Sequence, residues 1–193
     1  MVLVIDTSSA RAGLALVRDG EPVAEDVAAG VREHDLPGRV LALVEPRRLT
    51  AVAVAVGPGS FTGLRVGVSY GVGLAMGLDV PLLGLGSLDL QRARAAGPVT
   101  PLVEAGRGRV YWRGEGDEDP RLGEPSELPR GVPAAGWLRP ETAAAVRSAG
   151  VRLLEEGELA SFAAAAARLA GTAQRLGYDT VELKYMGYRP VWV

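Results

Sequence analysis

The sequence contains no cysteine and only one histidine, His34, and these two shortages exclude several kinds of chemistry. Without cysteine there is no disulfide, no thiolate nucleophile and no thiolate metal site. A metal site needs several good donors, which a single histidine does not supply. A peptidase triad needs a nucleophile, a base and an acid, and the lone histidine has no evident partners. We therefore expect no metal, no cofactor and no catalytic residue.

The chain also lacks an excess of charge of either sign. Its 21 basic and 23 acidic side chains are mixed through 193 residues, which gives a net charge of −2. No basic field exists to attract nucleic acid, so independent binding to nucleic acid is not expected. The 48% hydrophobic content is enough for one large domain or two small ones.

Long hydrophobic runs are absent too. The apolar run Val2 to Ile5 is interrupted by Asp6 and has no basic leader, which argues against a signal peptide. The charge-free segment from Val66 to Leu78 is shorter than the ~20 residues that cross a bilayer. The sequence therefore predicts a cytoplasmic protein without a membrane contact.

Residues 51–90 form the stretch around which the chain is organised: a buried strand, a glycine-rich turn and a long helix. The turn is not a P-loop, because Leu64 stands where the phosphate-binding lysine is needed and the only lysine is Lys184. The spacing of Gly57, Gly59 and Gly63 also fails the dinucleotide fingerprint.

Two interpretations of this turn remain. It is either a strand-to-helix connection capped by Ser60 or Thr62, which we favour, or an anion site at the helix N-terminus beside Arg65.

The helix that follows is unusual in its glycine content. Gly63, Gly67, Gly71 and Ala75 recur at every fourth position, and each interior glycine costs roughly 1 kcal/mol relative to alanine, so close packing must offset the loss. Two apolar flanks border this ridge; their residues are Leu64, Val68 and Val72 on one side and Val66, Tyr70 and Leu74 on the other. One flank should face the chain's own sheet. The other is covered either by the second half of the chain or by another protein.

Periodicity and turn residues predict the remaining elements. Three antiparallel strands are expected first, with a hairpin turn at Asp19-Gly20, and alternating strands and helices then imply parallel pairing. Gly97-Pro98 marks a boundary between a lobe of residues 1–96 and a smaller lobe of residues 97–193. The expected strands are 2–5, 12–17, 22–27, 52–56, 80–85, 99–104 and 109–113; the expected helices are 36–44, 60–78, 87–95, 140–148 and 161–171. Residues 114–135 are expected to be a loop, and residues 181–193 to pack back on the body.

The continuous run from Gly57 to Val68, GPGSFTGLRVGV, resembles the signature of the TsaB family, bacterial proteins that help to form threonylcarbamoyladenosine in tRNA. Further matches are residues 5–8 (IDTS), His34 opening a helix and residues 85–88 (LGSL). The resemblance covers the first half of the chain and thins after Tyr111.

This resemblance implies a two-lobed actin-like ATPase fold of the α/β class, related to ribonuclease H, with a shortened second lobe. Asp6, Thr7, Ser8 and Ser60 then become vestigial phosphate-loop candidates. The alternative for Asp6 and Thr7 is an Asx-type turn that bonds backbone amides.

Two further positions depart from the chemistry of related proteins. Glu104 stands where the family tends to have an aspartate, and it is interpreted either as a second acid or as a structural acceptor. The related catalytic subunit holds its metal with two histidines four residues apart. Here the fourth residue after His34 is Gly38, so His34 is expected only to begin a helix.

By this resemblance the chain is a non-catalytic scaffold for the transferase subunit TsaD, forms a homodimer when alone, and belongs to a complex that includes a further ATPase subunit. The expected interface combines two helices and uses Leu36, Val40, Leu43, Val66, Tyr70, Gly73 and Leu74. The alternative function is a stand-alone actin-like kinase or ATPase.

Overall fold

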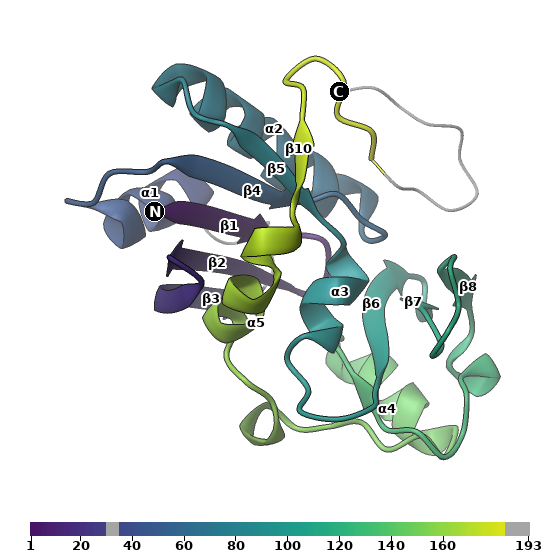
Figure 1. The fold of residues 1–193 in the computed structure, drawn as a ribbon. Helices are drawn as coiled ribbons and strands as arrows, with labels where there is room; N and C mark the ends of the chain where they lie inside the picture. The colour runs from purple at the N-terminus through teal and green to yellow at the C-terminus, as the bar shows by residue number, and fades with distance from the viewer. Residues whose placement is uncertain (30–34, 184–193) are drawn as a thin grey trace.

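The structure is a computed structural model that describes residues 1–29 and 35–183. Within these residues the strands form two sheets, one of six strands in the order β10-β5-β4-β1-β2-β3 and one of four in the order β8-β7-β6-β9 (Figure 1). The first sheet consists of β1 (Val2–Asp6), β2 (Arg11–Arg18), β3 (Glu21–Ala29), β4 (Ala51–Ala55), β5 (Leu82–Leu85) and β10 (Gln174–Leu176). The second consists of β6 (Thr100–Gly106), β7 (Arg109–Trp112), β8 (Arg121–Gly123) and β9 (Ala134–Ala135). The helices are α1 (Leu36–Val44), α2 (Phe61–Leu78), α3 (Ser87–Arg92), α4 (Pro140–Ser148) and α5 (Phe162–Leu169), with short 3₁₀ turns η1 (Pro125–Glu127), η2 (Glu156–Glu158) and η3 (Ala170–Thr172).

The predicted antiparallel start of the chain is confirmed. β1 pairs with β2 and β2 pairs with β3, both antiparallel. Between β2 and β3, Asp19 and Gly20 have φ of 53° and 80°, the left-handed values that a tight two-residue hairpin turn requires. The predicted parallel pairing is confirmed as well, because β4 lies between β1 and β5 and runs parallel to both.

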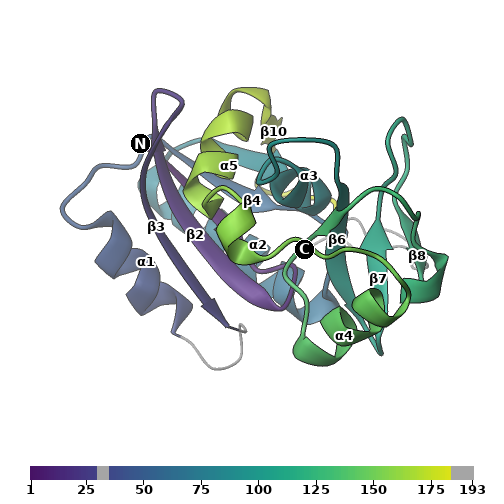
Figure 2. The same ribbon diagram turned by 90° about the horizontal axis from the view of Figure 1, so that it is seen from below.

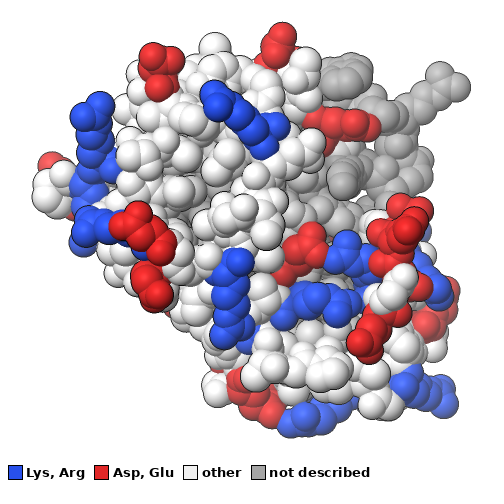
Figure 3. Space-filling view, in the orientation of Figure 1, with Lys and Arg blue, Asp and Glu red and all other residues white. Residues whose placement is uncertain are grey.

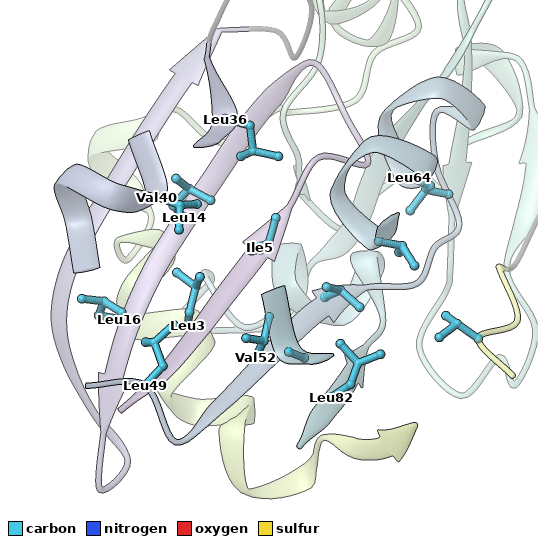
Figure 4. Packing of buried hydrophobic residues seen from close by; sticks show 14 of the residues in the cluster. Leu3, Ile5, Leu14, Leu16, Leu36, Val40, Leu49, Val52, Leu64 and Leu82 are labelled. Carbon is cyan, nitrogen blue, oxygen red and sulfur yellow. The ribbon is translucent and has the colours of Figure 1, made fainter. Parts of the chain in front are cut away.

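Helices cover both faces of the first sheet, as the two views show (Figures 1 and 2). Helices α1 and α2 lie on one face, where they enclose a core that includes Leu3, Leu14, Val52, Val40 and Leu64 (Figure 4). Helices α3 and α5 lie on the other face, over a second core that includes Trp137 and Phe162. This arrangement agrees with strand β4, whose five residues are all buried and which is covered on both faces.

The glycine ridge of α2 faces the sheet. Gly63, Gly67 and Gly71 are buried, and a Cβ atom at Gly71 would overlap Val54 of strand β4. Glycine at these positions lets the helix lie directly on the strands, which offsets its low helix propensity. The flank of α2 with Leu64 and Val68 is therefore the inner one, a choice that the sequence left open.

The second half of the chain is more regular than expected. The hairpin β6–β7 and the bounds of α4 are confirmed. The expectation that residues 114–135 form a loop is wrong in part, because they contain β8, η1 and β9. Strand β8 pairs with the edge of β7. Leu128 is buried in the core of the second sheet. Burial of one leucine and a short ladder thus order a segment that its composition marked as irregular.

The C-terminal elements return to the first sheet. Ser161 caps α5 as predicted, by accepting a hydrogen bond from the backbone N–H of Ala164 at 3.1 Å. Helix α5 ends at Leu169 rather than Gly171, and β10, which was not predicted, pairs antiparallel with β5. The division at residue 96 stays a prediction: the second sheet begins at Thr100, while α5 and β10 pack on the first sheet. Most of the tail that was expected to pack back, from residue 184 on, lies outside the described residues.

A search of the described helices finds none with the length and apolar content needed to span a membrane.

Two glycines of α2 give a matched test of the ridge. Gly71→Ala should lower the free energy of unfolding by about 1–3 kcal/mol, because the added methyl group overpacks against Val54. Gly73→Ala should instead raise it by up to about 1 kcal/mol, since nothing lies within 4 Å of the new Cβ atom and alanine favours the helix. Urea unfolding of the isolated protein measures both. An equal gain from the two substitutions would contradict the close packing of Gly71.

Candidate functional site

The loop after β1 is buried and hydrogen-bonded to itself. Asp6, Thr7, Ser8 and Ser9 are all at most 8% exposed. The Asp6 carboxylate accepts a hydrogen bond at 2.9 Å from the backbone N–H of Ser8 through its Oδ1 atom. This is the Asx-type turn that the sequence offered as the alternative to a phosphate contact. The other carboxylate oxygen of Asp6 and the Ser8 hydroxyl have no hydrogen-bond partner among the described residues.

Burial raises the pKa of Asp6 above its ordinary value of 3.8, and the hydrogen bond from Ser8 opposes that rise. Desolvation dominates because the charged carboxylate loses water and gains no cation in return. Relative to the unfolded chain, folding therefore shifts this side chain toward its protonated form.

The turn before α2 closes directly onto this loop. The backbone N–H of Ser60 donates to the carbonyl oxygen of Ser8 at 2.7 Å, and the Thr7 hydroxyl donates to the carbonyl oxygen of Gly63 at 2.7 Å. Ser60 also caps α2, since its hydroxyl accepts from the N–H of Gly63 at 3.3 Å. A Cβ atom at Gly59 would lie 2.5 Å from the Ser8 carbonyl oxygen. The structure thus brings all four phosphate-loop candidates together, in contact with one another.

This contact limits what the two loops can do chemically. A phosphate at a helix N-terminus is held by free backbone N–H groups. Here the N–H groups of Ser60 and Gly63 are already donated within the chain. The arrangement acts as a structural link between the end of β1 and the start of α2.

Ser9 and Glu104 connect the two sheets. The Ser9 hydroxyl donates to the carbonyl oxygen of Trp137 and accepts from the N–H of Glu104 at 3.1 Å. The Glu104 side chain is 3% exposed; it accepts from the Thr142 hydroxyl at 2.8 Å and from the N–H of Arg139 at 3.1 Å. Arg139 is the N-cap of α4, where a carboxylate is favoured by the helix dipole. Both oxygens of Glu104 thus have structural partners.

Within the described residues, no three or more His, Cys, Asp or Glu side chains are grouped as metal ligands would be. His34 and Lys184, which the sequence analysis considered, lie outside the described residues.

Helix α2 exposes an apolar stripe on the side away from the sheet. We define the α2 outer face as five exposed residues spaced alternately by four and three positions: Thr62, Val66, Ser69, Gly73 and Met76. Val66 is 38% exposed and Met76 is 56% exposed. This spacing is the heptad pattern of a helix that packs against another helix. It was present in the sequence, but we missed it because apolar residues surround the helix.

The predicted interface residues occupy different depths. Val66 and Gly73 lie on the α2 outer face, while Tyr70 and Leu74 are half-buried beside it.

On α1, Leu36 and Val40 are 5% and 3% exposed and pack in the core, so they support the helix from beneath rather than form its surface. Leu43 is half-buried, and Leu41, which the sequence analysis did not select, is 64% exposed.

Tyr70 of α2 packs against the same core as Leu36 and Val40 of α1. Burial raises the pKa of the Tyr70 hydroxyl, and the negative charge of Asp35, at the start of α1, raises it further. Helices α1 and α2 therefore lie over one core on the same face of the sheet. On the face that Figure 3 displays, positive and negative side chains are interspersed rather than gathered into a patch of one sign.

Sequence comparisons find similarity to proteins whose names refer to tRNA modification. Residues 41–125 match the family model described as TsaD: tRNA N6-adenosine threonylcarbamoyltransferase. The chain is 34% identical over 122 residues to the tRNA threonylcarbamoyladenosine biosynthesis protein TsaB of Bacillus subtilis (strain 168), covering 57% of this chain and 52% of the relative. It is 34% identical over 125 residues to the TsaB of Escherichia coli (strain K12), covering 58% and 53%. The chain thus spans about half the length of these relatives.

The fold is similar to that of a solved structure, YeaZ from Pseudomonas aeruginosa. The TM-score is 0.69 at 20% sequence identity, and the match covers 90% of this chain and 94% of that chain. At this identity the likeness concerns the fold. Together with the family match, it confirms the predicted actin-like ATPase, ribonuclease H-like fold.

The buried carboxyl group of Asp6 makes a prediction about pH. Because its pKa is raised in the folded state, its stabilising contribution is complete below pH 3.8 and is lost as the pH rises through the folded pKa. Asp6→Asn should therefore melt at a higher temperature than the wild type at neutral pH, and the difference should vanish at the acidic end. Melting temperatures across pH measure this.

The control is Asp119→Asn, which removes an exposed carboxylate and should leave the pH profile of stability unchanged. An Asp6→Asn protein that is less stable than the wild type at neutral pH would show that the charged carboxylate is favourable in the fold.

Proposed function

We propose that the chain, which is similar to TsaB proteins over about half of their length, is a member of the TsaB family and the non-catalytic, dimerising subunit of a complex that forms threonylcarbamoyladenosine in tRNA. In that complex it binds and supports a TsaD-like transferase subunit, which supplies the metal and the chemistry. A further ATPase subunit belongs to the same assembly. This role also places the protein in the cytoplasm.

The packing of the phosphate-loop candidates against one another carries the non-catalytic part of the proposal. Phosphoryl transfer depends on positioned cations and carboxylates that reach the substrate. Asp6 is instead fully buried beside Ser8, and Thr7 and Ser60 bond to the backbone of the neighbouring loop. Glu104, the residue considered as a second acid, uses both carboxylate oxygens to accept hydrogen bonds at the start of α4.

The α2 outer face supports the scaffolding part of the proposal. An exposed apolar stripe at heptad spacing buries well against one or two helices of a partner. Half-buried Tyr70 lies beside this stripe, and Leu41 is a further exposed apolar side chain on α1. Two such helix pairs from two chains would form a four-helix contact. We propose that the same surface pairs two copies of the free protein and is occupied by the TsaD-like subunit in the complex, so that the two associations compete.

Val66 allows a matched test of this surface. Val66→Glu should weaken both self-association and binding of the TsaD-like subunit, because either contact would bury an unpaired carboxylate. The control is Val23→Glu on β3, since Val23 is 39% exposed against 38% for Val66 and lies away from α2. Sedimentation velocity measures both associations. A Val66→Glu protein that still dimerises and still binds the subunit would place the contact elsewhere.

The alternative function is a stand-alone actin-like kinase or ATPase, and ATP hydrolysis separates it from the scaffold. The isolated protein should release phosphate from ATP no faster than buffer, because the N–H groups of Ser60 and Gly63 are already bonded and the described residues include no lysine. Turnover that Asp6→Ala abolishes would establish the enzyme instead.

The role in the complex is tested by reconstitution. The protein is co-purified with the TsaD-like subunit of the same organism, and tRNA modification is measured with and without it. Modification that needs this chain, while Asp6→Ala leaves the activity intact, would support a scaffold; equal modification without it would overturn the proposal.

A further inference from the structure

Arg65 is the only charged residue of α2 and has no counter-charge in the described part of the chain. Helix α2 runs from Phe61 to Leu78, so Arg65 lies near its N-terminus, where the helix dipole disfavours a cation. Its guanidinium group stacks over the Phe61 ring, 4.0 Å from the centroid. Its Nε atom is buried and has no hydrogen-bond acceptor among the described residues.

Three other arginines of limited exposure form ion pairs. Arg94 is bonded to Glu156 at 2.6 Å, Arg39 to Asp26 at 2.7 Å and Arg113 to Asp89. Their side chains are 3%, 14% and 25% exposed, respectively. A desolvated guanidinium without an anion is costly, and these pairs avoid that cost. Half-buried Arg65 has no such pair among the described residues; Arg92 and Arg109 have none there either, but only Arg65 has a buried guanidinium nitrogen without an acceptor.

The position of Arg65 joins it to the α2 outer face. Arg65 lies directly before Val66 and one turn before Ser69 of this face, so we expect a partner seated on the face to reach the guanidinium group. Covering it without an acceptor would add to its desolvation cost. The surface that fits here must therefore supply an anion as well as apolar side chains.

We propose that the partner subunit presents an aspartate or glutamate carboxylate to Arg65, set within an apolar contact on the α2 outer face. The inference rests on the proposed function, because it specifies the chemistry of that partner. Because the Nε atom is buried, a carboxylate of the partner would accept its two hydrogen bonds from the two Nη groups, and stacking on Phe61 restricts the orientation of the guanidinium plane. A phosphate is less suitable, because the N–H groups of Ser60 and Gly63 that would complete its cradle are already donated.

The experiment measures binding of the purified TsaD-like subunit to four variants at several salt concentrations. Arg65→Gln should raise the Kd by about tenfold or more, as expected for loss of a desolvated charge pair. Arg65→Lys should fall between wild type and Arg65→Gln, since it keeps the charge but not the fork. The control Arg18→Gln should bind like the wild type, because Arg18 is exposed at the opposite end of the sheet. The fourth variant, Val66→Glu, tests the surface itself.

Salt dependence separates a charge pair from a structural effect. The affinity of the wild-type protein should fall as the salt concentration rises, whereas the affinity of Arg65→Gln should depend less on salt. The melting temperature of Arg65→Gln should equal that of the wild type. Each acidic residue on the partner surface is then changed to its amide. One such change should strongly weaken binding of the partner to the wild-type protein, and should have little effect on its binding to Arg65→Gln.

The outcomes distinguish the two proposals. If Val66→Glu abolishes binding but Arg65→Gln leaves the affinity and its salt dependence unchanged, the carboxylate is wrong and the partner surface stands. If neither variant affects binding, the proposed function itself fails at this face. If Arg65→Gln weakens self-association alone, the carboxylate belongs to a second copy of this chain. If Arg65→Gln instead abolishes binding of inorganic phosphate, the group bound at Arg65 is a phosphate. Either result overturns the inference.

Discussion

The close approach of α2 to the first sheet is the packing constraint on which the rest of the structure depends. Three glycines at four-residue spacing let the helix lie on β1 and β4, with Gly63 and Gly67 against Thr7 and Gly71 against Val54. A side chain at any of these positions would meet backbone or a packed valine or threonine. The helix gives up about 3 kcal/mol of propensity for this contact, so the contact must return at least as much through packing.

That approach also decides the chemistry at the end of β1. With α2 this close, the turn before it bonds directly to the loop after β1, through Ser60 to Ser8 and Thr7 to Gly63. Space and backbone donors that a phosphate would need are taken by the chain itself. Asp6 is left with one carboxylate oxygen unbonded among the described residues and with a raised pKa, which is a cost in stability rather than a working acid. The four phosphate-loop candidates thus lie in an arrangement suited to holding the end of β1 and the start of α2 together.

Local signals in the sequence predicted most elements of the first sheet, and tertiary packing decided what they missed. Asp19-Gly20 determines its hairpin turn, and Pro140 begins its helix, because turn and cap chemistry act within a few residues. Strand β10 escaped prediction because it is short and two of its residues, Gln174 and Arg175, are polar and exposed; it forms by pairing with the edge of β5. At the candidate site, the residues Asp6 and Thr7 are compatible both with an Asx turn and with a phosphate-binding loop. Only the distance from Gly63 to Thr7, a contact between residues far apart in sequence, separates the two.

The two sides of α2 make opposite demands, and its composition follows from both. The inner side needs small residues for contact with the strands, while under the proposed function the outer side needs residues that tolerate water and can also pack against a partner. Thr62, Ser69 and Gly73 meet the second demand by keeping the stripe small and partly polar between Val66 and Met76. Neither requirement favours a charged side chain on this helix. The presence of one charged residue, Arg65, therefore needs a separate explanation. A cation at the border of an apolar contact costs little while water reaches it and becomes selective once water is excluded, because only a surface with a matching anion can then be seated without penalty.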